Sequence, residues 1–138
     1  MTEQEYSQRL NEAQPIRPRT QTGPQMTFAA FVYIWLCGLT ALGSACLFWS
    51  SPLLLTGILA VIGGLMLAVR KSAEDLLLCA FCGAFGAIAE AFGIASGAWS
   101  YTLPLASGVP IWLPVMWGIA ALFIKEIGLQ IHYLAKPP

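Results

Sequence analysis

Residues 87–117 read AIAEAFGIASGAWSYTLPLASGVPIWLPVMW, and they join two long apolar runs through a turn without charge. The first run contains a single carboxylic acid, Glu90. Glycines and prolines follow it, and the second run begins at Pro110 or at Pro114. Helices that are apolar all round face lipid or a fully buried core. The stretch therefore predicts two membrane helices joined by a turn, and it sets the expectation for the rest of the chain.

The composition agrees with a membrane protein. Apolar residues make up 57% of the 138 residues, and charged residues make up only 10%. Soluble domains carry about 25% charged residues. The net charge is zero, which suggests neither nucleic acid nor another bulk anion as a partner. We predict one domain, an all-α integral membrane protein built as a bundle of four transmembrane helices, with the lipid bilayer as its first partner.

The apolar runs define four expected spans. Each is long enough to cross a hydrocarbon core of about 30 Å at about 1.5 Å per residue. Residues 26–134 form the predicted transmembrane domain, residues 1–25 a disordered cytoplasmic tail, and residues 135–138 a C-terminal tail. Lys125 can extend to the interface, which allows the fourth helix to continue to Leu134. The predicted spans are residues 26–49, 53–69, 75–97 and 110–134.

Two short connections carry helix-start signals. Ser51 precedes Pro52, which predicts a serine cap with proline in the first helical position. Ser72-x-x-Asp75 has the spacing of a capping box, with Asp in place of the usual Glu. We therefore expect new helices to start at both connections.

The distribution of positive charge predicts the orientation. All seven Lys and Arg residues lie in the N-terminal tail, in the second connection or in the C-terminal segment. Positive residues favour the cytoplasmic side of a membrane. We expect a protein of the plasma (inner) membrane with both termini in the cytoplasm and the loops 50–52 and 98–110 outside.

Small residues of the third span recur every three or four positions and share one face with Glu90. Small residues allow helices to approach closely in lipid, so we predict helix packing there. Cys79 and Cys82 lie within the same apolar run and are interpreted as small packing residues rather than as a redox pair or a metal site. We predict neither a metal nor a cofactor. The predicted packing glycines are Gly83, Gly86, Gly93 and Gly97.

Glu90 is the candidate catalytic residue. An acid inside a membrane helix is costly, and such residues mark functional sites by default. Glu90 is expected about eight residues inside the outer end of its helix, roughly 12 Å deep, where burial favours the neutral, protonated form. The alternative is a neutral Glu that forms a hydrogen bond to a neighbouring helix.

Four aromatic residues are the candidate ligand-binding residues. Trp99, Tyr101 and Trp112 are expected near the membrane surface, and Trp117 at a depth similar to that of Glu90. One interpretation is an outward-facing aromatic pocket with the acid at its base, suited to a polyene or another isoprenoid chain. There a protonated Glu90 donates to an alkene, and aromatic faces stabilise the cation. The alternative is an aromatic belt without a ligand.

The same stretch resembles a segment of the bacterial carotenoid biosynthesis membrane proteins, which include the carotenoid 1,2-hydratases. The resemblance implies a shared fold fragment and a site for an isoprenoid chain. It covers residues 87–117 and rests on Glu90-x-x-Gly93-x-x-x-Gly97-x-Trp99-x-Tyr101, on Pro104, on Gly108-Val109-Pro110, and on Pro114 and Trp117.

Three functions stay open from the sequence. The first is a membrane protein that binds or modifies a long isoprenoid or carotenoid-like lipid through Glu90 and the aromatic residues. The second is a non-enzymatic structural or accessory subunit that packs through small-residue faces, with itself as a homo-oligomer or with another membrane protein. The third is a proton-coupled transporter assembled as an oligomer around Glu90.

Overall fold

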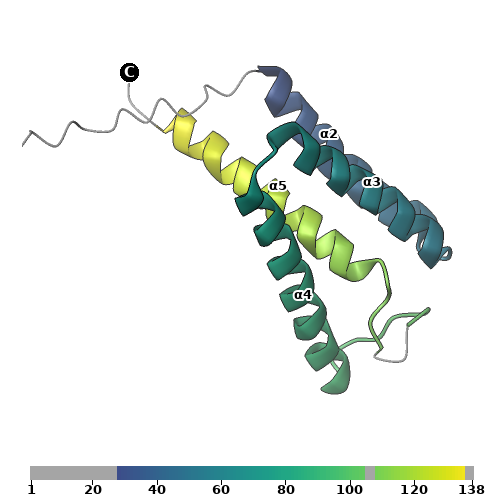
Figure 1. Ribbon diagram of the computed structural model, residues 1–138. Helices are drawn as coiled ribbons and strands as arrows, with labels where there is room; N and C mark the ends of the chain where they lie inside the picture. Colours follow the sequence, from purple (N-terminus) through teal and green to yellow (C-terminus); the bar gives the residue numbers. More distant parts are fainter. Residues whose placement is uncertain (1–27, 105–107, 136–138) are drawn as a thin grey trace, which may run out of the picture.

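The computed structural model describes residues 28–104 and 108–135, so the predicted disordered tail of residues 1–25 lies outside the described residues. The described chain folds into four α-helices, each long and apolar enough to cross a membrane (Figure 1). This confirms the all-α, four-span membrane protein expected from the sequence. The helices are α2 (Phe28–Phe48), α3 (Pro52–Arg70), α4 (Ala73–Ala95) and α5 (Leu113–Leu134).

Local signals explain where α4 begins and ends. The Ser72 side chain accepts a hydrogen bond from the Asp75 backbone N–H at 3.3 Å, as the capping spacing predicts. The helix ends at Ala95, two residues before the predicted end. Gly97 has φ +75° and its N–H bonds to the Ile94 carbonyl, while the Ala98 N–H bonds to the Gly93 carbonyl. This pair of bonds around a left-handed glycine is a Schellman motif, which stops the helix and reverses the chain.

The two proline-containing helix starts differ in detail from the sequence expectation. Ser51 occupies the cap position of α3 but makes no side-chain capping bond, so the predicted serine cap is wrong. Pro52 does begin that helix. α5 begins at Leu113 and holds Pro114 in its first turn, where the missing N–H has no helical partner to lose. Pro110 instead closes a turn, in which its carbonyl accepts from the Leu113 N–H at 3.1 Å.

α5 is the central helix of the bundle. It packs against α2, α3 and α4, whereas α4 has only slight contact with α3. Figure 1 shows α2 and α3 side by side and α4 diverging from them toward the connection that leads into α5. α4 is therefore held mainly by α5.

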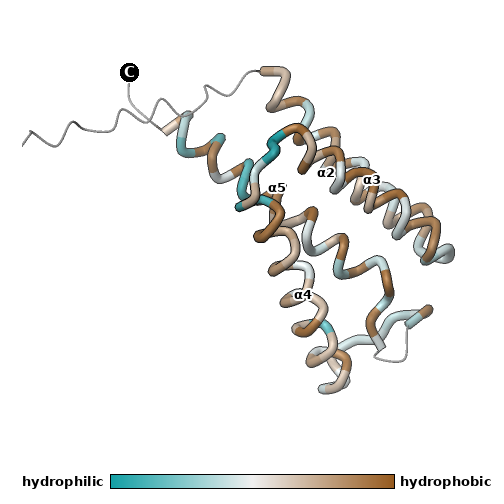
Figure 2. The backbone as a smooth tube through the Cα atoms, viewed as in Figure 1, coloured by the Kyte–Doolittle hydropathy of each residue, from teal (hydrophilic) through white to brown (hydrophobic). Residues whose placement is uncertain are grey.

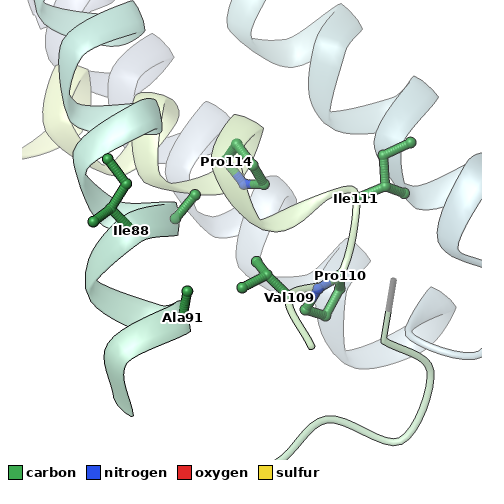
Figure 3. Close-up of a pocket in the computed structure, with 7 residues that line it drawn as sticks. Ile88, Ala91, Val109, Pro110, Ile111 and Pro114 are labelled. Atoms are coloured by element: carbon green, nitrogen blue, oxygen red, sulfur yellow. The ribbon is translucent and has the colours of Figure 1, made fainter. Parts of the chain in front are cut away.

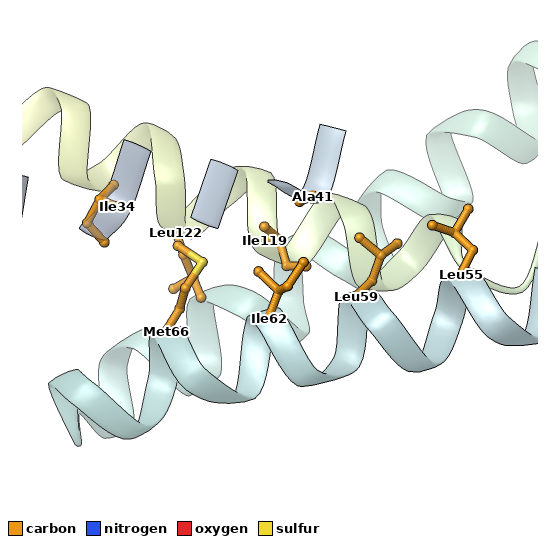
Figure 4. Close-up of a cluster of buried hydrophobic side chains, with 8 residues drawn as sticks. All are labelled: Ile34, Ala41, Leu55, Leu59, Ile62, Met66, Ile119 and Leu122. Carbon is orange, nitrogen blue, oxygen red and sulfur yellow. The ribbon is translucent and has the colours of Figure 1, made fainter. Parts of the chain in front are cut away.

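The buried hydrophobic core comes from α2, α3 and α5 (Figure 4), and α4 reaches it only through the partly buried Leu78 and Cys79. The α4–α5 contact depends instead on close approach of the two backbones. A Cβ added to Gly83 would lie 2.7 Å from the Pro114 carbonyl oxygen, and one added to Gly118 would lie 2.6 Å from Cys79 Sγ. Small residues permit this approach in lipid. The core residues are Ile34, Ala41, Leu55, Leu59, Ile62, Met66, Ile119 and Leu122.

The two ends of the bundle differ in charge. Hydrophilic positions gather where α3 meets α4 and along the later part of α5 (Figure 2). We call the end that contains Arg70, Asp75 and Lys125 the charged end. The opposite end, with the connections 49–51 and 96–112, contains no Lys, Arg, Asp, Glu or His in its connections and is called the uncharged end.

Candidate functional site at the uncharged end

Glu90 lies five residues before the end of α4, so it is about 8 Å along the helix from that end. This is shallower than the sequence suggested, because the helix stops before Gly97. The reversal at Gly97 carries the following connection back along α4. Trp99 Nε1 donates to Glu90 Oε2 at 2.9 Å, and the Tyr101 hydroxyl donates to the same oxygen at 2.9 Å. Two candidate ligand-binding residues therefore bind the candidate acid directly.

Gly93 allows the Trp99 ring to lie against the helix. A Cβ at this position would be 2.2 Å from Trp99 Cζ2, so any larger residue would displace the indole. One turn separates Gly93 from Glu90, so packing and hydrogen bonding fix the same ring at two points. Trp99 is still 48% exposed. Within this chain Gly93 therefore contacts an aromatic ring of the connection, and its role in packing against another helix stays a prediction.

Tyr101 connects Glu90 to the start of α5. Its ring meets Trp112 edge-on, with centroids 6.3 Å apart and an interplanar angle of 89°, a favourable aromatic geometry. Burial raises the pKa of Tyr101 to about 12, and the hydrogen bond to Glu90 contributes in the same direction. The hydroxyl is therefore a neutral donor at physiological pH. Glu90, Trp99, Tyr101 and Trp112 form one linked group, which we call the aromatic–acid cluster.

Trp117 does not join this cluster. Its ring lies on Gly86, where an added Cβ would be 2.3 Å from Trp117 Cγ. Gly86 is one turn from Glu90 toward the charged end. Trp117 therefore lies about one helical turn deeper than Glu90, and not at the similar depth that was expected. Trp117 lines a separate groove between α4 and α5, together with Leu78 and Cys82.

Only one of the two oxygens of the Glu90 carboxyl group accepts hydrogen bonds from described residues. Both donors bind Oε2, and within the described part of the chain Oε1 has no hydrogen-bond partner. This geometry suits a carboxylate, whose negative charge two donors stabilise. It also suits a neutral acid that accepts on Oε2 and keeps Oε1–H as a donor. No group of three potential metal ligands occurs among the described residues.

An apolar cavity of about 280 Å³ lies beside the cluster, between α4 and the chain that leads into α5 (Figure 3). Ala87, Ile88 and Ala91 form one wall, and Val109, Pro110, Ile111 and Pro114 form the other. Ile111 also lines a second cavity of about 350 Å³, with Pro52, Leu53 and Thr102–Pro104. Both are close to the range of about 300–1,000 Å³ typical of small-molecule sites. We call the two together the outer cleft. Its lining differs from the aromatic pocket expected from the sequence.

The charged end contains a network of ion pairs that was not predicted from the sequence. Arg70 Nε bonds to Asp75 Oδ2 at 2.8 Å, Arg70 also pairs with Glu126, and Lys125 pairs with Asp75. The side chains of Asp75 and Glu126 are 1% and 4% exposed. Lys125 therefore pairs at this end of the bundle, with Asp75. A feature of the sequence could have predicted this network. Residues 70–75 and residues 125–126 each contain both positive and negative side chains, and both segments are expected at the same depth of the membrane.

Comparisons with known proteins add no relative. No protein-family model, no curated protein and no solved structure matches this chain. The described side chains and their contacts are therefore the basis for a functional proposal.

Proposed function

We propose that this four-span membrane protein binds a long apolar chain of isoprenoid type in the outer cleft. The observation that carries the proposal is the cleft itself. α3 and α4 diverge at the uncharged end, and two apolar cavities that share Ile111 lie there. Mostly apolar concave sites with few polar groups are typical of sites for small ligands.

The aromatic–acid cluster supports the shape of this cleft. Glu90 holds Tyr101, and the next three residues, Thr102–Pro104, line the second cavity. Tyr101 also contacts Trp112, which follows the shared residue Ile111. Glu90 itself lines neither cavity. We therefore assign Glu90 as a positioning residue for binding, and its catalytic role stays a prediction.

Two features favour an isoprenoid chain as the ligand. The first cavity is lined only by alanine, isoleucine, valine and proline, so branched apolar groups meet a matching surface. In addition, residues 87–117 resemble the bacterial carotenoid biosynthesis membrane proteins, whose ligands are isoprenoid. A straight acyl chain is the competing ligand, and the experiment below separates the two.

The test is mass spectrometry of the organic extract from gently purified full-length protein. Wild type is compared with Ala91→Phe, which places a ring in the cleft, and with Ala89→Phe on the same helix. Ala89 is exposed and about 200° around the helix from Ala91. We expect an isoprenoid in near-stoichiometric amount from wild type and from Ala89→Phe, reduced at least fivefold in Ala91→Phe. Equal phospholipid content in all three samples, without an isoprenoid, would refute the proposal.

The second candidate function is that of a structural subunit. Its predicted contact glycines Gly86 and Gly93 already meet Trp117 and Trp99 of the same chain. Gly57 and Gly64 of α3 instead have no neighbour within 4 Å of an added Cβ and lie exposed. A structural role therefore predicts association through α3. Gly64→Leu should then dissociate an oligomer that survives in mild detergent, and an unchanged mass by light scattering would exclude this face.

We also propose that the charged end faces the cytoplasm, on the basis of the positive-charge distribution. Single cysteines in a cysteine-free background test this. A membrane-impermeant maleimide added to intact cells should label Ser100→Cys and leave Lys71→Cys unlabelled. The reverse labelling pattern would contradict the proposed orientation.

A further inference from the structure

Glu90 is an acid that has no counter-charge within residues 28–104 and 108–135. Among the described residues, every other Asp, Glu, Lys, Arg and His belongs to the last turn of α3, the connection to α4, the first turn of α4, or α5 from Lys125 onward. There Arg70, Asp75, Lys125 and Glu126 pair with one another. A carboxylate at membrane depth is stabilised by a cation or by protonation. The uncharged end supplies hydrogen-bond donors to Glu90 but no cation.

The groups around Glu90 suit an organic cation. Trp99 and Tyr101 turn their polar edges toward Oε2, which leaves Oε1 without a partner in the described chain. Trp99 is 48% exposed, so part of its ring is accessible from the surroundings. Aromatic rings attract alkylammonium groups through their faces. One carboxylate oxygen next to aromatic surface is the chemistry of an ammonium site, whereas a metal ion needs several oxygen, nitrogen or sulfur ligands.

We propose that Glu90, Trp99 and Tyr101 form a binding site for an alkylammonium group. The ammonium lies at Glu90 Oε1 and against the exposed part of the Trp99 ring. It belongs either to the headgroup of an amine-containing lipid or to a free organic cation, since the chemistry is the same. This site is separate from the outer cleft, and it does not require a chain to be bound there.

The first experiment is calorimetric titration of the full chain in dodecyl maltoside with benzyltrimethylammonium. Glu90→Gln keeps an amide oxygen that can accept from Trp99 and Tyr101 but removes the charge, so the fold is retained. We expect saturable binding to wild type and at least a tenfold loss of affinity in Glu90→Gln. Trp99→Leu should lose affinity by roughly 2- to 30-fold, the range of a single cation–π contact.

The matched control is Glu74→Gln, the same substitution at an exposed acid at the opposite end of α4. It should bind as wild type does. Size-exclusion profiles and near-ultraviolet circular dichroism show whether each variant is folded. The proposal is overturned if wild type shows no saturable binding, or if folded Glu90→Gln binds as tightly as wild type.

A second experiment separates the two sources of the ammonium group. Native mass spectrometry compares retention of phosphatidylethanolamine and phosphatidylglycerol with identical acyl chains. Preferential retention of phosphatidylethanolamine, lost in Glu90→Gln, identifies a lipid headgroup. Equal retention of both lipids, together with benzyltrimethylammonium binding, identifies a free organic cation. Absence of ammonium binding would not change the amount of isoprenoid in the organic extract. The ammonium site and the proposed isoprenoid binding can therefore be refuted separately.

Discussion

Replacing Asp75 with Asn should destabilise the protein more than any other conservative change at the charged end. Asp75 is buried at the start of α4 and binds Arg70 of α3 and Lys125 of α5. It therefore joins three helices through one carboxylate. Asparagine has nearly the same shape, so the change tests charge rather than volume. Its amide oxygen can still accept from Arg70, but its NH₂ group is a donor and cannot accept a hydrogen bond from the Lys125 ammonium.

The expected loss of stability in Asp75→Asn follows from the solvent exposure of Asp75 and of its partners Arg70 and Lys125. Removing one member of a fully buried pair costs about 3–5 kcal/mol, whereas an exposed pair contributes about 0.2–1 kcal/mol. The Asp75 side chain is 1% exposed, but those of Arg70 and Lys125 are 33% and 31% exposed, so water screens them in part. The loss should lie between these limits, at roughly 2–3 kcal/mol.

The assay is unfolding of the full chain in mixed micelles, with increasing dodecyl sulfate and detection by circular dichroism. Glu74→Gln is the control, because Glu74 is the adjacent acid and lies exposed. It should stay within about 0.5 kcal/mol of wild type, as surface substitutions usually do. If Asp75→Asn and Glu74→Gln unfold at the same midpoint, the network contributes nothing and the reasoning from burial is refuted.

Three further changes probe the uncharged end. Gly86→Ala should lower the free energy of unfolding by about 1–3 kcal/mol, because its Cβ would lie 2.3 Å from Trp117 Cγ. The control Gly64→Ala should leave the free energy of unfolding unchanged, because nothing lies within 4 Å of an added Cβ there. Equal unfolding midpoints for the two variants would contradict the close contact between Gly86 and Trp117. Glu90→Leu should cost about 1–3 kcal/mol and speed proteolysis of residues 96–104, since two hydrogen bonds of about 0.5–1.5 kcal/mol each, one exposed and one partly buried, lose their acceptor. Glu90→Gln should not, and similar proteolysis of both variants would show that these two bonds do not hold the connection. The Tyr101 pKa is raised in the folded chain from 10.0 to about 12, so above pH 10 the unfolded chain releases its proton first. Stability should be flat below pH 10 and fall between pH 10 and 12, and a Tyr101→Phe variant with the same decline would remove Tyr101 as its cause.

The helices could be predicted because lipid imposes a simple requirement on sequence. Each span must be apolar over a fixed length, and that requirement alone located α2 to α5 within three residues at each end. The Ser72 cap was predictable for the same reason, since it depends on neighbours in the chain. The start of α5 was left open between Pro110 and Pro114, because both prolines suit a first turn, and the turn closed by Pro110 decides between them.

The contacts between helices were harder to predict. Association of helices in lipid depends on small differences in packing rather than on burial from water. Glu90 and its aromatic neighbours were singled out by type, but the bonds to Trp99 and Tyr101 depend on the chain reversing at Gly97. Trp117 was grouped with Glu90 by depth, although the structure places it on Gly86. The bonds from Asp75 to Lys125 and from Arg70 to Glu126 join residues 50 and 56 positions apart, a separation that no local pattern predicts.

The central position of α5 has a consequence for biosynthesis. α5 follows α2, α3 and α4 in the chain, yet it supplies Ile119 and Leu122 to the core and nearly all of the surface on which α4 packs. Before α5 enters the bilayer, α4 has only its slight contact with α3, and Asp75 is not yet paired with Lys125. α4 must therefore stay loosely associated until α5 has been inserted, so assembly of these four helices depends on the arrival of α5.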